Sequence, residues 1–193
     1  MHDQEGIAAN ARLFEVAARL LVVELDADAL DALLHPEIAQ LFEEIAPGFT
    51  TEVKDLRDQP ESMELLEAEF CKLFLMSKAT SPQASVWAGG EQLAKAAAIA
   101  AQVDHWQSVL DVELVDGPWG NVPKDHFAVI LGLYSMALLA EPSGKLAQEI
   151  HDAVLGDCLP RFCAAVSEHT TSQIYRGVVG LLEQLLEDQV REA

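Results

Sequence analysis

Apolar residues recur at helical spacing along nearly the whole chain, whereas the alternation typical of strands hardly occurs. Spacings of three and four residues place side chains on one face of a helix, and a spacing of two would place them on one face of a strand. Residues 7–25 show the helical pattern, and residues 126–140 are apolar nearly all round. The sequence therefore predicts an all-α fold, a bundle of eight or more helices.

Capping and helix-breaking residues set the expected boundaries of these helices. Asp28 is expected to cap a helix that runs to the turn at Gly48. Near the C-terminus, helices over 145–155 and 158–168 are expected to separate near Gly156. The length of 193 residues suits one domain over 1–193.

Two long loops are expected, near 77–86 and 111–124. Asp125 is in position to cap the helix after the second loop, and Thr170 or Thr171 to cap the last helix. Loops of this length in a helical domain are often functional. The two loops are therefore candidate functional segments.

The charge balance narrows the possible partners. The chain has 32 acidic and 12 basic side chains, a formal net charge of −20, and 50% hydrophobic residues. An acidic surface repels nucleic acid and anionic membranes, and it attracts basic ligands. A basic ligand is therefore one interpretation, and acidity that only maintains solubility is the other.

The cysteines and the apolar segments indicate a cytoplasmic protein. Cys71, Cys158 and Cys163 form no C-x-x-C pair, which argues against a disulfide framework and a zinc site. The first residues lack the basic and apolar regions of a signal peptide. Residues 127–140 are too few to span a bilayer, which takes about 20. No integral membrane segment is expected.

Asp125 and His126 are the strongest catalytic candidates by residue type. Adjacent residues on a helix do not face each other, so capping of the helix explains the pair equally well. The sequence has no G-x-S-x-G elbow, no phosphate-binding loop and no convincing metal-ligand set. No catalytic residue, metal or cofactor is expected. The alternative is a small helical nucleotide- or pterin-binding protein or enzyme that uses Asp125 and His126.

Large aromatic residues flank both expected loops. Phe70, Phe74 and Trp87 flank the first, and Trp119 and Phe127 flank the second. Such residues either line a groove for an apolar peptide segment or seal the core beneath the loops. Beside an acidic surface, a groove would suit a peptide that is both apolar and basic.

Two motifs at these loops resemble a known family. Glu-Phe-Cys-Lys-Leu-Phe at 69–74 precedes Pro82 and the Ser-Val-Trp of 85–87, and Pro-Lys-Asp-His-Phe occupies 123–127. In this order they are similar to the redox-enzyme maturation chaperones of the TorD/DmsD type. Leu-Pro-Arg-Phe at 159–162 and Tyr175 match more loosely. The chain departs from the family after the Asp-His pair, where members usually carry glutamates.

The resemblance implies a TorD-like cytoplasmic chaperone without enzymatic turnover. Such proteins bind the twin-arginine signal peptide, the apo form of an exported molybdopterin oxidoreductase, or both, and assist cofactor insertion before export. The family occurs as monomers and as domain-swapped homodimers, whose hinge would lie in 111–124. A structural adaptor that recognises only folded partners is a further alternative.

The positions that match the family give the expected peptide-binding residues. Phe70, Leu73 and Phe74 are expected to form a groove wall, and Ser85 and Trp87 to contact the peptide from the loop. Pro123, Asp125 and His126 form the hallmark loop. Asp125 is also expected to meet an arginine of the client, because guanidinium and carboxylate groups pair well.

Overall fold

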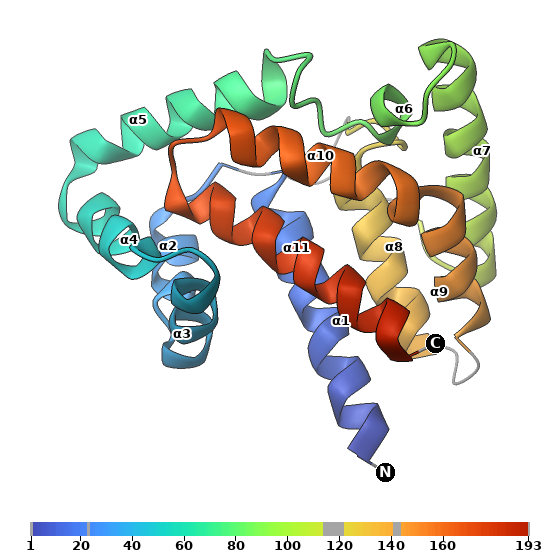
Figure 1. Cartoon of the computed structure of the whole chain (residues 1–193), viewed down its shortest axis with the longest axis horizontal. Coiled ribbons are helices and arrows are strands. Elements are labelled where there is room, and N and C mark those ends of the chain that lie inside the picture. The colour runs from blue at the N-terminus through green and yellow to red at the C-terminus, as the bar shows by residue number, and fades with distance from the viewer. Residues whose placement is uncertain (1, 23, 114–121, 141–143, 193) are drawn as a thin grey trace. The chain divides into compact units, whose positions relative to one another are not determined.

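The computed structural model describes residues 2–22, 24–113, 122–140 and 144–192. Within these ranges the chain is helical and contains no strand (Figure 1). An isolated β-bridge pairs Gln83 with His126. The predicted all-α fold is therefore confirmed. None of the helices in the described ranges is long and apolar enough to cross a membrane. The middle of the predicted loop 111–124, including Trp119, lies outside the described residues.

The chain divides into two compact units, Met1–Val23 with Pro82–Phe162 and Glu24–Ser81 with Cys163–Ala193. The first unit contains α1 (His2–Leu20), α6 (Ala84–Trp87), α7 (Gln92–Leu110), α8 (Phe127–Ala140), α9 (Lys145–Ile150), the π-helical turn η2 (His151–Leu155) and the start of α10 (Gly156–His169). The second contains α2 (Ala27–Leu33), α3 (Pro36–Ile45), α4 (Phe49–Asp58), α5 (Pro60–Phe70), the π-helical turn η1 (Cys71–Leu75), the end of α10 and α11 (Gln173–Glu192). One domain over 1–193 stays a prediction.

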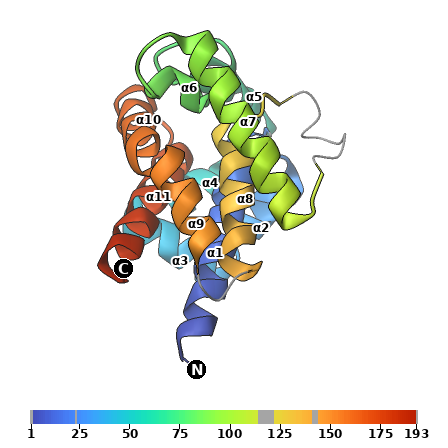
Figure 2. The same cartoon turned by 90° about the vertical axis from the view of Figure 1, so that its right-hand side faces the viewer.

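Helix α8 lies at the centre of the first unit. It carries no charged residue, and it packs against α1, α7 and α9 (Figure 2). The rings of Phe14 on α1 and Tyr134 on α8 meet edge to face, with centroids 5.0 Å apart. A helix that is apolar all round is stable in water only when neighbours cover it, which explains this central position.

Helix α11 packs against α3 and α4 in the second unit. Gly177 and Gly180 allow this close approach. A Cβ at 177 would lie 2.6 Å from a ring carbon of Phe42, and one at 180 would lie 2.5 Å from a methyl carbon of Ile45. The ring of Phe42 is stacked on Phe49 at 4.7 Å, so it has little room to move.

Carboxylates from neighbouring helices cap the start of α11. Glu69 accepts hydrogen bonds from the backbone N–H groups of Thr171 (2.8 Å) and Ser172 (3.1 Å) and from the hydroxyl of Thr170 (2.5 Å). Glu52 accepts from the Ser172 hydroxyl (2.6 Å) and the Gln173 N–H (2.5 Å). These bonds satisfy donors that have no partner inside the helix.

Several predicted helix boundaries are wrong. Pro36 divides the expected helix from Asp28 into α2 and α3, because proline fits the first turn of a helix and not its interior. The side-chain cap of α2 is Asp26, which accepts from the Ala29 N–H at 2.8 Å. Helix α4 was not expected. It begins after Gly48, whose φ of 95° favours glycine.

The expected separation near Gly156 is also wrong. The chain continues from α9 through η2 into α10 without a loop, and Pro160 lies inside α10. Pro160 occupies the second turn of α10, a few residues after the π-helical turn at 151–155. Ser172, and neither Thr170 nor Thr171, caps α11: its hydroxyl accepts from the Ile174 N–H at 3.1 Å.

Candidate functional site

In the first unit, backbone hydrogen bonds join the ends of the two predicted loops. The Ala84 N–H donates to the Asp125 carbonyl at 2.7 Å, and the Phe127 N–H donates to the Pro82 carbonyl at 2.8 Å. These bonds form the isolated bridge between Gln83 and His126. Segments 40 residues apart in the chain are therefore held side by side, and α6 and α8 start from this junction.

Asp125 reinforces the junction with its side chain. Its carboxylate accepts from the Ser85 hydroxyl at 2.5 Å and from the Gln83 amide at 3.5 Å. The residue is only 4% exposed. A buried carboxylate needs such partners, because an unpaired one would lose its hydration without compensation. Asp125 therefore fixes the first loop against the second.

His126, and not Asp125, caps α8. Its ring Nδ1 accepts a hydrogen bond from the Ala128 N–H at 3.1 Å, and its carbonyl accepts from Val129 and Ile130. The predicted cap at Asp125 is therefore wrong, because that carboxylate is turned toward Ser85. Burial lowers the pKa of His126 to about 4, although the nearby Asp125 charge acts to raise it. The ring is neutral at pH 7, as an acceptor at Nδ1 requires.

Trp87 lies at the end of α6 and belongs to an aromatic cluster with Phe127 and Phe162. The centroids of Trp87 and Phe162 are 6.2 Å apart, and those of Phe127 and Phe162 are 4.9 Å apart. Arg161 donates from its guanidinium to the Trp87 carbonyl at 3.1 Å, which caps the C-terminal end of α6. Pro123 is exposed at the start of the junction, and its carbonyl accepts from the His126 N–H at 2.9 Å.

The structure thus brings together five of the predicted binding residues in the first unit. They are Ser85, Trp87, Pro123, Asp125 and His126. Sequence reasoning did not assign the Arg161 contact or the aromatic partner Phe162, although both lie in the Leu-Pro-Arg-Phe segment that matches the family loosely.

Phe70, Leu73 and Phe74, the other predicted residues, belong to the second unit. They lie where α5 becomes η1, and all three are buried. Phe70 and Phe74 pack against Tyr175, with ring centroids 6.4 Å and 5.3 Å away. The Thr80 hydroxyl donates to the Leu73 carbonyl at 2.5 Å, which anchors the chain that leaves η1. In this structure the three side chains form core packing.

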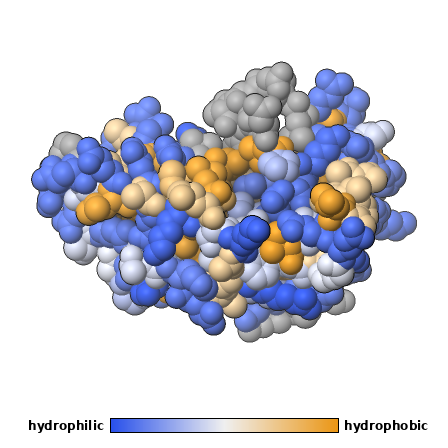
Figure 3. Space-filling model, turned by 90° about the horizontal axis from the view of Figure 1, so that it is seen from above, coloured by the Kyte–Doolittle hydropathy of each residue, from blue (hydrophilic) through white to orange (hydrophobic). Residues whose placement is uncertain are grey.

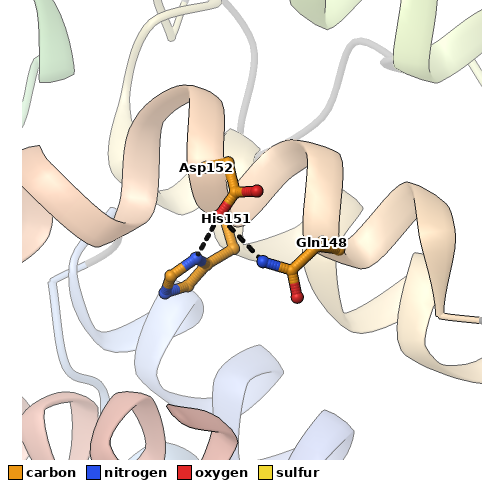
Figure 4. A network of polar contacts seen from close by, with 3 residues as sticks. All are labelled: Gln148, His151 and Asp152. Atoms are coloured by element: carbon orange, nitrogen blue, oxygen red, sulfur yellow. Dashed lines mark hydrogen bonds and ion pairs between the residues drawn. The ribbon is translucent and has the colours of Figure 1, made fainter. Parts of the chain in front are cut away.

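Another polar network joins the end of α9 to the start of η2 (Figure 4). Asp152 accepts from the Gln148 amide at 2.8 Å and lies 3.0 Å from Nδ1 of His151. The contact with His151, then that with Gln148, lowers the pKa of Asp152. In the described parts of the chain no group of three or more His, Cys, Asp and Glu residues is placed to hold a metal ion.

The described residues thus define an all-helical protein in which buried, paired polar groups hold two loop ends together. A family model described as nitrate reductase delta subunit matches residues 27–171, which is more than half of the 193-residue chain. The chain belongs to this family, which confirms the resemblance seen in the two motifs. Its members are molybdoenzyme maturation chaperones and not enzymes. Comparison with curated proteins and with solved structures gives no match.

Proposed function

We propose that this chain is a cytoplasmic chaperone that binds the twin-arginine signal peptide, the apo form of an exported molybdoenzyme, or both, and assists cofactor insertion before export. The observation that carries the proposal is the junction between residues 82–85 and 123–127, which gathers five of the motif residues in one unit. The family match gives the class of client, a molybdoenzyme such as nitrate reductase.

The charge of the chain supports a basic, partly apolar ligand. A net charge of −20 raises the encounter rate with a twin-arginine segment, and the effect weakens with salt. Trp87 and Pro123 reach the surface at the junction and offer apolar contact. We propose that these two side chains touch the peptide. Contact through Ser85, Phe70, Leu73 and Phe74 stays a prediction, which requires these buried side chains to become exposed.

Asp125 and His126 contribute to the proposed site by fixing its shape. Both are buried, and both already use their side chains within the unit. Asp125→Asn keeps an oxygen acceptor for Ser85 and removes the charge. We expect this variant to bind the peptide with unchanged salt dependence. A clear loss of salt dependence would instead support direct contact between Asp125 and a client arginine.

The direct test is calorimetry with synthetic twin-arginine signal peptides from molybdoenzymes of the same genome, at two salt concentrations. We expect one peptide to bind with micromolar or tighter affinity, to bind more weakly at high salt, and to lose binding when both arginines become alanine. Failure of every peptide would reject signal-peptide binding and favour an adaptor that recognises only folded partners. Sedimentation of the same samples distinguishes a monomer from a domain-swapped homodimer.

A further inference from the structure

A pocket of about 470 Å³ opens between α4 and α5. All of its lining residues belong to the second unit. Its volume lies within the range of roughly 300–1,000 Å³ that is usual for ligand pockets. None of the lining residues of this pocket belongs to the loop junction described above.

Three carboxylates line this pocket. Glu52 and Asp55 are three residues apart on α4, and Glu69 comes from α5. Glu52 and Glu69 are held in place by the start of α11, as described above. Asp55 is exposed, and its carboxylate accepts no hydrogen bond from the described residues. No basic side chain in the described ranges forms an ion pair with any of the three.

Leucines complete the lining. Leu56 and Leu66 are buried, whereas Leu65 is 73% exposed beside the carboxylates. Figure 3 shows patches of hydrophobic surface among hydrophilic surface on the face that carries α5. An exposed leucine next to an acidic pocket matches a partner that presents a cation and an apolar side chain together.

We propose that this pocket receives an arginine side chain of a partner segment in which an apolar residue lies beside the arginine. The guanidinium carries five N–H donors in a plane, so it can bond to carboxylates on both walls, whereas an ammonium is a compact point charge. Its methylene groups would pack against the leucines. This inference rests on the proposed function, because the twin-arginine signal peptide supplies the arginine.

Paired substitutions on α4 test the pocket in the full-length protein. Asp55→Asn removes a charge from the pocket, and Asp58→Asn removes the same charge from an exposed position of the same helix outside it. The probe is the synthetic twin-arginine peptide that binds the unchanged protein. We expect Asp55→Asn to weaken binding about fivefold and to reduce its salt dependence, and Asp58→Asn to change affinity less than about twofold.

Peptide variants then identify the group that enters the pocket. Citrulline has the shape of arginine without its charge, so a peptide with one arginine replaced by citrulline should lose affinity. If that arginine binds Asp55, the replacement should cost less in Asp55→Asn than in the unchanged protein. A lysine peptide that binds as tightly as the arginine peptide would overturn the preference for guanidinium.

The outcomes separate this inference from the proposed function. If the peptide binds, needs its arginines, and binds Asp55→Asn as tightly as Asp58→Asn, the pocket proposal is wrong and the chaperone proposal stands. If no twin-arginine peptide binds the unchanged protein, signal-peptide binding is rejected, and the pocket proposal fails with it.

Discussion

His126 uses a neutral ring to cap α8, and this makes the fold sensitive to acid. Its pKa is about 4 in the folded chain and about 6.5 when unfolded, so the unfolded chain binds more protons between these values. The stability that the neutral ring contributes is therefore complete above about pH 6.5 and is lost as the pH falls toward 4.

The variant His126→Asn should remove this acid sensitivity. Asparagine is a good N-cap and does not titrate. Between pH 7 and 4.5 we expect the free energy of unfolding of the unchanged protein to fall by roughly 2 kcal/mol more than that of the variant. Urea denaturation at both pH values measures the difference. Parallel pH profiles for the two proteins would show that His126 does not remain neutral when folded.

Tyr175 carries a buried hydroxyl without a hydrogen-bond partner in the described structure. The residue is 1% exposed, and burial, followed by the charges of Glu69, Glu24 and Glu52, raises the pKa of its phenol. An unsatisfied buried polar group destabilises a fold. We expect Tyr175→Phe to raise the free energy of unfolding by about 1 kcal/mol in urea denaturation. A loss of similar size would mean that the hydroxyl has a partner.

Most helices could be predicted, because the spacing of their apolar residues is a local property of the sequence. The ends of the helices were harder to predict. The apolar stretch at 126–140 became α8, since its pattern needs no information from elsewhere in the chain. Helix α4 escaped prediction because it is polar and its mean hydropathy is low, and its buried face depends on Phe49 and Val53 meeting other helices. Glu52 and Glu69 cap α11 from more than 100 residues away, which no local pattern indicates.

The close packing of α11 can be tested with two glycine variants. At Gly177 an added methyl group would collide with Phe42, whereas at Gly132 on α8 it would meet nothing within 4 Å. We expect Gly177→Ala to lower the free energy of unfolding by roughly 1–3 kcal/mol through overpacking. Gly132→Ala should raise it by up to about 1 kcal/mol through helix propensity. Equal effects in denaturation experiments would contradict the close contact.

The motifs located part of the candidate site, and the fold explains why they did not define all of it. Ser85 and Asp125 were found through the family pattern, and their hydrogen bond accounts for that pattern physically. The capping role of His126 could not be predicted, because whether its ring or the Asp125 carboxylate turns toward α8 depends on Ser85, 41 residues earlier in the sequence. The pocket between α4 and α5 had no signal, because α4 itself was missed.

The charge of the chain should make salt act in opposite directions on stability and on binding. A net charge of −20 destabilises the folded chain through self-repulsion, which salt screens. Between 20 and 500 mM NaCl we expect Tm to rise by about 3 °C, which corresponds to roughly 1 kcal/mol. Over the same range, the affinity for a twin-arginine peptide should fall, because the attraction is screened as well.

Sucrose at equal osmolality is the control, since it leaves charges unscreened and should not weaken peptide binding. A Tm that falls as NaCl is added would show that attractive ion pairs outweigh the repulsion. Binding that is insensitive to NaCl would show that the peptide is held by apolar contacts alone.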